Sequence, residues 1–364
     1  MKCRVAYVCE FPTLLGGEHS MLAFLKGSRE WLEPTVIAPA TGRLAEALAA
    51  RGIDHLPWWG GEEGQATLAS GLRERRVELV HANSLMTADR ARRLGKRLGL
   101  PAIAHVRDIM RLSDGRKGRL AKLDAIIAVS KAVASDLIAQ GLPGDLVKTI
   151  HNGVDGASLR SQVVPGRFRA ELGLPPESRL LGCIGQVALR KGQDLFLEMA
   201  ESLADRDGTI HFVLAGARYS SKEESRQFEE GLHEKATGSR LRGRVHFVGY
   251  RTDVPSILND LDLLVIPSRQ EPLSRVLLEG LALGVPVVAT NVGGMEELLD
   301  HGRTGLLVAP DDAATLAEAA WELLRDEPRR RELRPMGPRW VSERFSVERQ
   351  TQAIRSLYED VLGR

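Results

Sequence analysis

The sequence predicts an α/β protein with two doubly wound domains, each built on a parallel sheet that helices cover. Short runs rich in β-branched residues alternate with helical stretches along the chain, and these runs are apolar on both faces. Such runs are typical of parallel strands that are buried on both sides. The length of 364 residues exceeds the size at which one hydrophobic core usually keeps growing, so two domains are expected.

The predicted strands fall into two groups along the chain. The first group is 4–8, 35–39, 79–83, 102–106, 125–129 and 148–152, and the second is 180–185, 210–216, 244–249, 261–267, 286–290 and 305–310. Between the groups, residues 155–179 lack strand periodicity and contain several Gly and Pro, as in a linker followed by a short helix. We therefore place the first domain at 1–163 and the second at 164–345. In 346–364, a helical stripe of apolar residues predicts a final helix that packs on another element.

Composition and charge narrow the class of protein. Apolar residues make up 43% of the chain and charged residues 27%, and about 18 uncharged apolar residues never occur in succession, so we expect a soluble, cytoplasmic protein. Cys3, Cys9 and Cys183 have no metal-ligand spacing and are expected to be reduced, buried thiols. Residues 73–122 carry 14 Lys and Arg against five Asp and Glu. This surface fits an anionic membrane, a phosphorylated acceptor or nucleic acid, and equally a solvated Arg-rich face.

A carboxylate stands inside an otherwise apolar helical segment. The helix is predicted to begin at Ser274, a good N-cap residue, and to stop at Gly284. Glu279 lies inside it, where burial of a carboxylate is costly unless the group is paired or hydrogen-bonded. Glu271 lies eight positions earlier, in the strand-to-helix loop, at the edge of a parallel sheet where ligands bind. A phosphate at the helix N-terminus, a ribose on Glu279 and a sugar near Glu271 fit this pattern; a buried ion pair of Glu279 with an Arg or Lys fits equally well.

A basic pair occupies another strand-end loop of the same predicted sheet. The buried strand 180–185 runs through a Gly-containing loop into a helix, and this loop carries Arg190 and Lys191. Cations there can neutralise a diphosphate leaving group. Because basic pairs are common in loops, this one gains weight only beside Glu271 and Glu279.

These residues resemble the retaining glycosyltransferases of family 4, which have the GT-B architecture of two Rossmann-like domains facing a central cleft. Glu271 and Glu279 match the E-x7-E pair of that family. The likeness also includes Lys191-Gly192, 248–255, 291–299 and 301–312 in the second domain, and 14–17, 128–130 and 150–155 in the first. It covers nearly the whole chain and is most specific across 245–312.

The resemblance implies transfer of a sugar from a nucleotide diphosphate sugar, with UDP-sugars favoured, to a hydroxyl of a glycan, lipid-linked or small-molecule acceptor. The reaction would retain the anomeric configuration and serve cell-surface glycan or glycolipid synthesis. It also implies that the C-terminal helix crosses back to the first domain. The implied catalytic residues are Glu271, Lys191, Arg190, His105 and Arg107. The implied donor-binding residues are Gly16, Gly17, Gly185, Tyr250, Arg251, Leu273, Ser274 and Glu279. The implied acceptor-side residues are Asn83, Ser84, Asp108 and Asn152.

The sequence departs from the family pattern at three positions of the site. One is His19, which stands two positions after the glycine pair, where the family usually has acidic character. Gln186 follows the strand glycine where the family often has Arg, and Arg190 is its candidate replacement. Arg107 stands where a histidine is common, so either Arg107 or His105 takes that role. A histidine inside an apolar strand, as His105 is, is more often a satisfied core residue.

Other classes of protein share parts of this pattern. A sugar-nucleotide epimerase or a phosphorylase can use the same two-domain frame, and a noncatalytic nucleic-acid-binding protein would explain 73–122 but leave both glutamates without a role. A dehydrogenase is disfavoured, because G-x-G-x-x-G with a later acidic residue is missing. We expect no nucleic-acid partner and no cofactor. Peripheral contact with an anionic membrane is a further prediction from the basic segment 73–122.

The sequence also contains an apparent D-x-D at Asp260 and Asp262. These residues precede an apolar strand and therefore lie at its amino end, away from the ligand edge. They are predicted to end a helix and solvate a turn, and transfer is predicted to need no metal.

Overall fold

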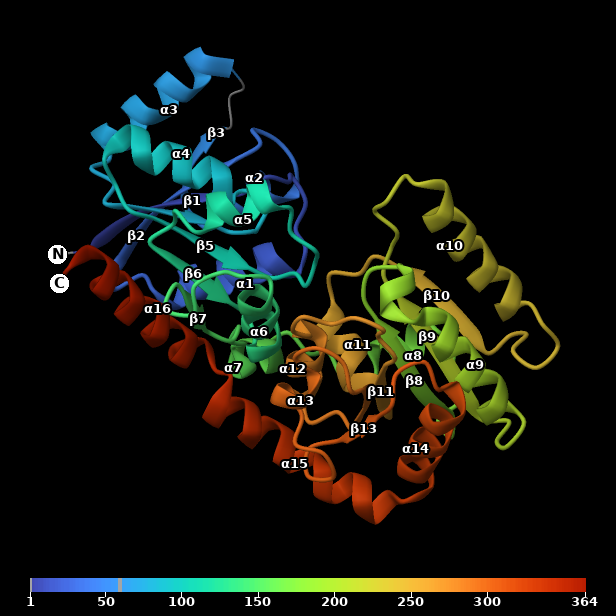
Figure 1. Ribbon diagram of the computed structural model, residues 1–364. Helices are drawn as coiled ribbons and strands as arrows, with labels where there is room; N and C mark the ends of the chain where they lie inside the picture. Colours follow the sequence, from blue (N-terminus) through green and yellow to red (C-terminus); the bar gives the residue numbers. More distant parts are fainter. Residues whose placement is uncertain (1, 58–60) are drawn as a thin grey trace. The chain divides into compact units, whose positions relative to one another are not determined.

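Each predicted strand forms, and each belongs to one of two parallel sheets that lie in separate units (Figure 1). The structure is a computed structural model that describes residues 2–57 and 61–364. Unit 1 comprises Met1–Gly153 with Val347–Arg364, and unit 2 comprises Val154–Ser346. The boundary placed after residue 163 thus falls within unit 2. There Val154 pairs with Ser346, and Arg160 donates to the carbonyl of Ala282.

Unit 1 alternates strands and helices. In chain order its elements are β1 (Cys3–Val8), α1 (Gly16–Gly27), β2 (Leu32–Ala38), α2 (Arg43–Ala49), β3 (Asp54–Pro57), α3 (Gly61–Glu74), β4 (Leu79–Ala82), α4 (Ala88–Leu98), β5 (Ala102–Val106), α5 (Asp114–Leu120), β6 (Ala125–Ala128), α6 (Lys131–Ala139) and β7 (Val147–Thr149), followed at the end of the chain by α16 (Val347–Leu362). The strand order is β3-β2-β1-β4-β5-β6-β7. Chain progression therefore reverses between β1 and β4.

Unit 2 repeats this plan. Its elements are α7 (Gly156–Ser161), α8 (Arg167–Glu171), β8 (Arg179–Ile184), the 3₁₀ turn η1 (Leu189–Lys191), α9 (Gln193–Ala204), β9 (Ile210–Ala215), α10 (Glu223–Ala236), β10 (Val245–Gly249), α11 (Val254–Asp260), β11 (Leu263–Ile266), α12 (Arg275–Ala282), β12 (Val287–Thr290), α13 (Met295–Leu298), β13 (Leu306–Val308), α14 (Ala313–Arg325) and α15 (Glu327–Arg344). The strand order is β10-β9-β8-β11-β12-β13, so the reversal lies between β8 and β11.

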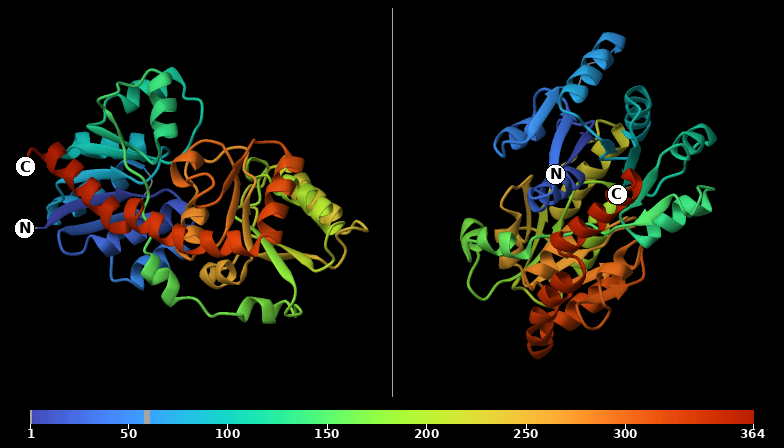
Figure 2. Two further views of the ribbon diagram at one scale, coloured as in Figure 1. Left: turned by 90° about the horizontal axis from the view of Figure 1, so that it is seen from below. Right: turned by 90° about the vertical axis from the view of Figure 1, so that its left-hand side faces the viewer.

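Helices cover both faces of each sheet (Figure 2). This is why the central strands read as continuous apolar runs: Val5, Val80 and Ile103 have no exposed surface in unit 1. The edge strand β3 was not predicted. Its four residues, D-H-L-P, include a charged residue and a proline and are only partly buried, so it carries no apolar run.

The C-terminal helix α16 packs on α1 in unit 1. Its apolar stripe includes Ile354, Leu357 and Tyr358, which belong to the same core as Tyr7 and other residues of β1 and α1. The Tyr358 hydroxyl lies 2.5 Å from the Tyr7 hydroxyl, across 351 positions of sequence. The last helix of the chain is therefore part of the first domain's core.

Candidate functional site

The reversal point of unit 2 brings two loops together at the carboxyl edge of its sheet. One loop follows β8 and contains Gly185 and Lys191; the other follows β11 and contains Glu271 and Ser274. Ligands of doubly wound sheets bind at such a point. The two motifs that the sequence analysis singled out in this domain thus meet where a ligand is expected.

The loop after β8 is held in shape by its neighbours. Buried Gln193 donates from its amide to the carbonyl of Gln186 at 2.8 Å, which fixes the start of the loop. Gly192 has a φ of +69°, and a Cβ at this position would lie 1.9 Å from the carbonyl oxygen of Pro267. Only glycine allows this close approach, which brings Lys191 against the loop after β11.

Lys191 and Glu271 form an ion pair at the centre of this arrangement. The Glu271 side chain is 5% exposed and the Lys191 side chain 18%, so water reaches the pair from the lysine side only. Ser268 donates a further hydrogen bond to Glu271 at 3.4 Å. Arg269 bridges the two loops, because its backbone N–H donates to the Arg190 carbonyl at 2.8 Å. The structure thus presents a buried carboxylate and a partly accessible ammonium group side by side.

Helix α12 begins at the predicted residue. The Ser274 side chain accepts a hydrogen bond from the N–H of Leu277 at 3.4 Å, and both Leu273 and Ser274 are buried. Glu279 accepts a hydrogen bond from Arg275 Nε at 2.6 Å. The sequence left two interpretations of Glu279 open, a contact with ribose and a buried ion pair. The structure shows an ion pair, and its partner, Arg275, was not named from the sequence. The i,i+4 spacing was the signal for Arg275.

The other two basic residues of the predicted site in unit 2, Arg190 and Arg251, have different partners. Arg190 is exposed and donates to the Gln186 side chain at 3.2 Å, so its guanidinium lies beside the position it was expected to replace. Arg251 instead pairs with Glu171 at 2.6 Å and Asp253 at 2.8 Å. Hydrogen bonds to Asp253 and Glu171 raise the pKa of Arg251. Its charge is thus balanced by carboxylates, and Tyr250, which is partly buried, directly precedes it.

The aspartates of the D-x-D sequence lie at the amino end of β11, as expected, but they do not solvate a turn. Asp260 is buried and accepts hydrogen bonds from the N–H groups of Gly166 at 2.8 Å and Phe168 at 2.9 Å. Asp262 accepts from Arg169 at 2.6 Å and from the N–H of Leu180 at 2.8 Å. Asp260 holds the start of α8, where N–H groups lack intrahelical partners, and Asp262 holds the same helix through the Arg169 side chain.

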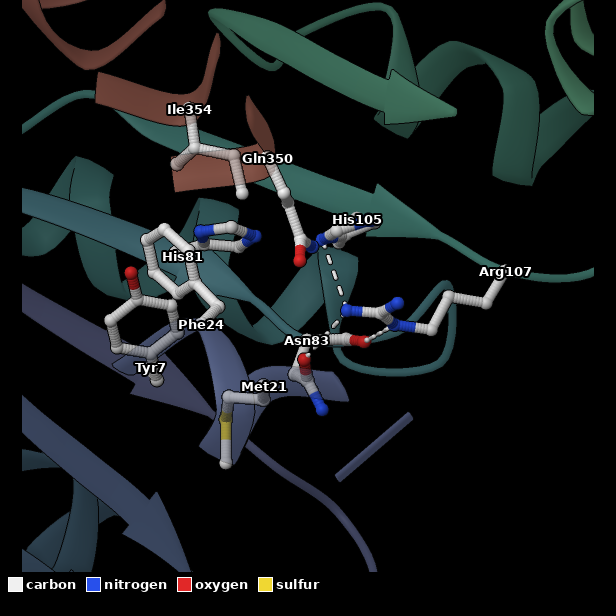
Figure 3. Close-up of a pocket in the computed structure, with 9 residues that line it drawn as sticks. All are labelled: Tyr7, Met21, Phe24, His81, Asn83, His105, Arg107, Gln350 and Ile354. Carbon is white, nitrogen blue, oxygen red and sulfur yellow. Dashed lines mark hydrogen bonds between the residues drawn. The ribbon is translucent and has the colours of Figure 1, made fainter. Parts of the chain in front are cut away.

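A second polar cluster lies in unit 1, around Arg107 (Figure 3). Arg107 donates to the Asn152 side chain at 2.7 Å, to the Asn83 carbonyl at 3.2 Å and to His105 Nδ1 at 3.1 Å. A Cβ on Gly17 would lie 3.3 Å from the Arg107 side chain, so the start of α1 touches this cluster. The structure thus brings two of the predicted acceptor-side residues, Asn83 and Asn152, together with Arg107, which was predicted to be catalytic.

The remaining predicted residues of this domain lie at the margin of the cluster. Gly16 begins α1, and a Cβ there would meet nothing within 4 Å. Ser84 is half-buried and its backbone N–H donates to the Thr87 hydroxyl at 3.3 Å. Asp108 is exposed. Each of these three residues is a direct chain neighbour of a residue of the cluster: Gly17, Asn83 or Arg107.

His105 is a buried partner of Arg107. It is 2% exposed, whereas Arg107 is only partly buried, so Arg107 is the member of the pair that solvent can reach. Because a guanidinium can only donate, His105 Nδ1 must accept, and the neutral ring carries its proton on Nε2. Burial and then the charge of Arg107 hold the pKa of His105 well below its usual value, which agrees with a neutral ring.

The sequence analysis missed the polar residues behind His105. His81 stacks on His105 with ring centroids 5.7 Å apart, and its Nδ1 lies 2.6 Å from the Tyr358 hydroxyl. Burial and then Arg107 lower the pKa of His81 to about 3. His81, His105 and Gln350 of α16 line one small cavity. The histidine in the apolar run 79–83 was the available signal.

Comparison with known structures defines the class of protein. Anabaena Alr3699/HepE, solved in complex with UDP-glucose, has a TM-score of 0.87 and 23% identity and covers 98% of this chain and 99% of that one. WaaG, a glycosyltransferase involved in lipopolysaccharide biosynthesis, has a TM-score of 0.72 and 16% identity over 96% of this chain and 98% of that one. The fold is that of the GT-B glycosyltransferases.

Sequence comparison then defines the family. The Glycosyltransferase Family 4 pattern matches residues 16–157, and the pattern of glycosyl transferases group 1 matches 178–326. The lipopolysaccharide core biosynthesis mannosyltransferase LpsB of Rhizobium meliloti is 33% identical over 244 residues, 66% of this chain and 67% of the relative. N-acetyl-α-D-glucosaminyl L-malate synthase of Bacillus anthracis is 27% identical over 276 residues, 74% of this chain and 70% of that one. The chain belongs to glycosyltransferase family 4.

One finding concerns membranes. Within residues 2–57 and 61–364, the helices are all too short or too polar to cross a bilayer.

Proposed function

We propose that this glycosyltransferase moves a sugar from a UDP-sugar to a hydroxyl of a cell-surface glycan or glycolipid precursor, with retention of anomeric configuration and without a metal ion. The observation that carries the proposal is the Lys191–Glu271 pair at the reversal point of unit 2, next to the N-terminus of α12. The UDP preference is supported by HepE, whose structure holds UDP-glucose.

The proposed chemistry rests on charge stabilisation. As the bond between the sugar and the diphosphate breaks, negative charge develops on the leaving diphosphate. Lys191 and the free N–H groups at the start of α12 are positive groups that would stabilise this charge, and Arg190 is exposed nearby to contribute. Such groups supply the role that a divalent cation plays in other transferases. Glu271 would hold the transferred sugar, and Glu279 would exchange Arg275 for the ribose.

Unit 1 would supply the acceptor side. We assign the contact with substrate there to Arg107, since it is reachable, and a supporting role to His105, since it is buried and neutral. Asn83 and Asn152 hold the Arg107 guanidinium by their oxygen atoms. Of the two residues that the sequence left open for this role, we therefore propose Arg107.

The test is to incubate the purified protein with a panel of nucleotide sugars and candidate acceptors, and to determine the product's anomeric configuration by NMR. We expect turnover with a UDP-sugar, a product with the donor's configuration, and full rate in EDTA. Inverted product, or a rate that vanishes in EDTA and returns with Mg²⁺, would contradict the corresponding part of the proposal. Epimerised nucleotide sugar, or phosphate-dependent cleavage, would identify an epimerase or a phosphorylase instead.

We further propose that α4 contacts an anionic membrane at the cytoplasmic face. The helix buries small residues, Ala88, Ala91 and Gly95, and turns a basic face to solvent. Arg92 contributes less to that face, because its side chain is only 20% exposed and pairs with Asp89 at 2.8 Å. The exposed basic residues are Arg90, Arg93, Lys96 and Arg97. Clustered basic residues attract anionic lipid.

A further inference from the structure

The guanidinium of Arg107 is held by groups from three separate segments of unit 1. His105 lies on β5 and Asn83 directly follows β4, so both are anchored by the central strands of the sheet. Asn152 lies in irregular chain after β7, yet its hydrogen bond to Arg107, at 2.7 Å, is the shortest of those that hold the guanidinium. Whatever holds Asn152 is therefore one of the contacts that set where Arg107 points.

The chain next to Asn152 is held by Gln350, from the other end of the sequence. The N–H of Gly153 donates to Gln350 Oε1 at 2.9 Å in a buried hydrogen bond that spans 197 positions. The neighbouring Asn152 is itself only 8% exposed. A buried N–H outside regular secondary structure needs such a partner, because it has lost water and has no ladder or helix bond. Gln350 thus fixes the segment that carries Asn152.

Gln350 is in turn rigidly placed by α16. It is 3% exposed, and Ile354 and Tyr358 follow it at intervals of one helical turn on the same face. The Tyr358 hydroxyl is bonded to Tyr7 and to His81, which stacks on His105. Figure 3 shows Gln350 and Ile354 entering from α16 and lining one small cavity with His105 and Arg107.

We infer that Gln350 is a positioning residue for sugar transfer: it sets the Asn152–Gly153 segment and, through Asn152, the orientation of Arg107. This inference rests on the proposed function, in which Arg107 contacts substrate. Small displacements of a substrate-contacting group lower rates steeply, and about 1 Å of misplacement costs on the order of a hundredfold. Loss of Gln350 Oε1 would act on Arg107 indirectly, through Asn152. We therefore expect a smaller effect than direct misplacement of Arg107, a fall in kcat/KM of about tenfold or more.

The test compares a substitution that removes the acceptor oxygen of Gln350 with one that keeps it. Gln350→Met keeps the length and volume of the side chain but removes the acceptor, while Gln350→Glu keeps an oxygen for the Gly153 N–H. Leu357→Val is the matched control, because Leu357 is a buried core residue of the same helix and lies outside the site. For each variant we would measure kcat and KM for donor and acceptor, UDP affinity, the Tm, and the Arg107 Nε–H signal by NMR.

We expect Gln350→Met to lose kcat/KM for the acceptor at unchanged UDP affinity, and to shift the Arg107 Nε–H signal. Gln350→Glu should recover most of the loss, and Leu357→Val should lower the Tm with normal kinetics. Wild-type kinetics and an unmoved Arg107 signal in Gln350→Met would overturn the inference and leave the proposed function intact. If the wild type transfers no sugar, the proposed function fails, and the Arg107 signal alone then decides whether Gln350 positions it.

Discussion

Replacing Lys191 by Met should destabilise unit 2 as well as abolish sugar transfer. The substitution leaves Glu271 as a carboxylate that is 5% exposed, with Ser268 as its remaining side-chain partner at 3.4 Å. Removing one member of a buried ion pair costs about 3–5 kcal/mol. Because the Lys191 side chain is 18% exposed, we expect the lower end of this range, about 3 kcal/mol.

Adding Glu271→Gln to Lys191→Met separates stability from catalysis. The amide removes the stranded charge, so the double variant should regain about 2 kcal/mol of stability and remain inactive. Hydrogen exchange at the amides of β8 and β11 reports the local opening free energy for the wild type, both single variants and the double variant. The reasoning is refuted if Lys191→Met opens no more readily than the wild type, or if the double variant is no more stable than Lys191→Met.

Three further outcomes are expected. Between pH 7 and pH 5 His81 should lower the stability of unit 1 by about 2 kcal/mol, because its pKa is about 3 when folded and ordinary when unfolded, so only the unfolded chain takes up the proton. The pKa of buried His105 is lowered as well, so this residue adds to the fall. Hydrogen exchange of β4 amides should therefore show a smaller pH dependence in His81→Asn than in the wild type, and an equal one would contradict the contribution of His81. Glu279→Gln should weaken UDP binding about tenfold in calorimetry while kcat stays within twofold, because the proposed charge-assisted hydrogen bond to ribose would be lost. Exposed Glu296→Gln is the control. Equal UDP affinities of Glu279→Gln and the wild type would remove Glu279 from the site. Arg93→Glu with Lys96→Glu should reduce cosedimentation with anionic vesicles and leave neutral vesicles unaffected, and binding that ignores lipid charge and salt would leave α4 as a solvated surface.

Sequence reasoning predicts well what depends on local pattern. The central strands follow from apolar runs, and the start of α12 follows from Ser274 standing before a helical segment. The meeting of Lys191 with Glu271 also follows, since both occupy carboxyl-end loops of strands in one parallel sheet. When the sequence pattern identifies two strands of one parallel sheet and places a residue in the loop after each, it also predicts that both residues lie at the carboxyl edge of that sheet.

Partners that the fold brings from far away could not be predicted in this manner. The Tyr7 and Tyr358 hydroxyls meet across nearly the whole chain, and Gln350 meets Gly153 only because α16 returns to unit 1. Periodicity shows that α16 has a buried face but does not name the surface it covers. Arg251 illustrates the same limit: its position after β10 suggests a ligand contact, while one of its two carboxylate partners, Glu171, is 80 positions away.

The placement of α16 also bears on the order in which the protein can fold during synthesis. Unit 2 is one continuous stretch of chain, Val154–Ser346, and all of it leaves the ribosome before the residues of α16. Synthesis of unit 1 starts first, but this unit is completed last, because Tyr7 of its first strand lacks the Tyr358 contact until α16 emerges from the ribosome. Domains generally fold as units in the order in which they are completed. Here the domain encoded second is complete first, and the domain encoded first stays open to chaperones until α16 has left the ribosome.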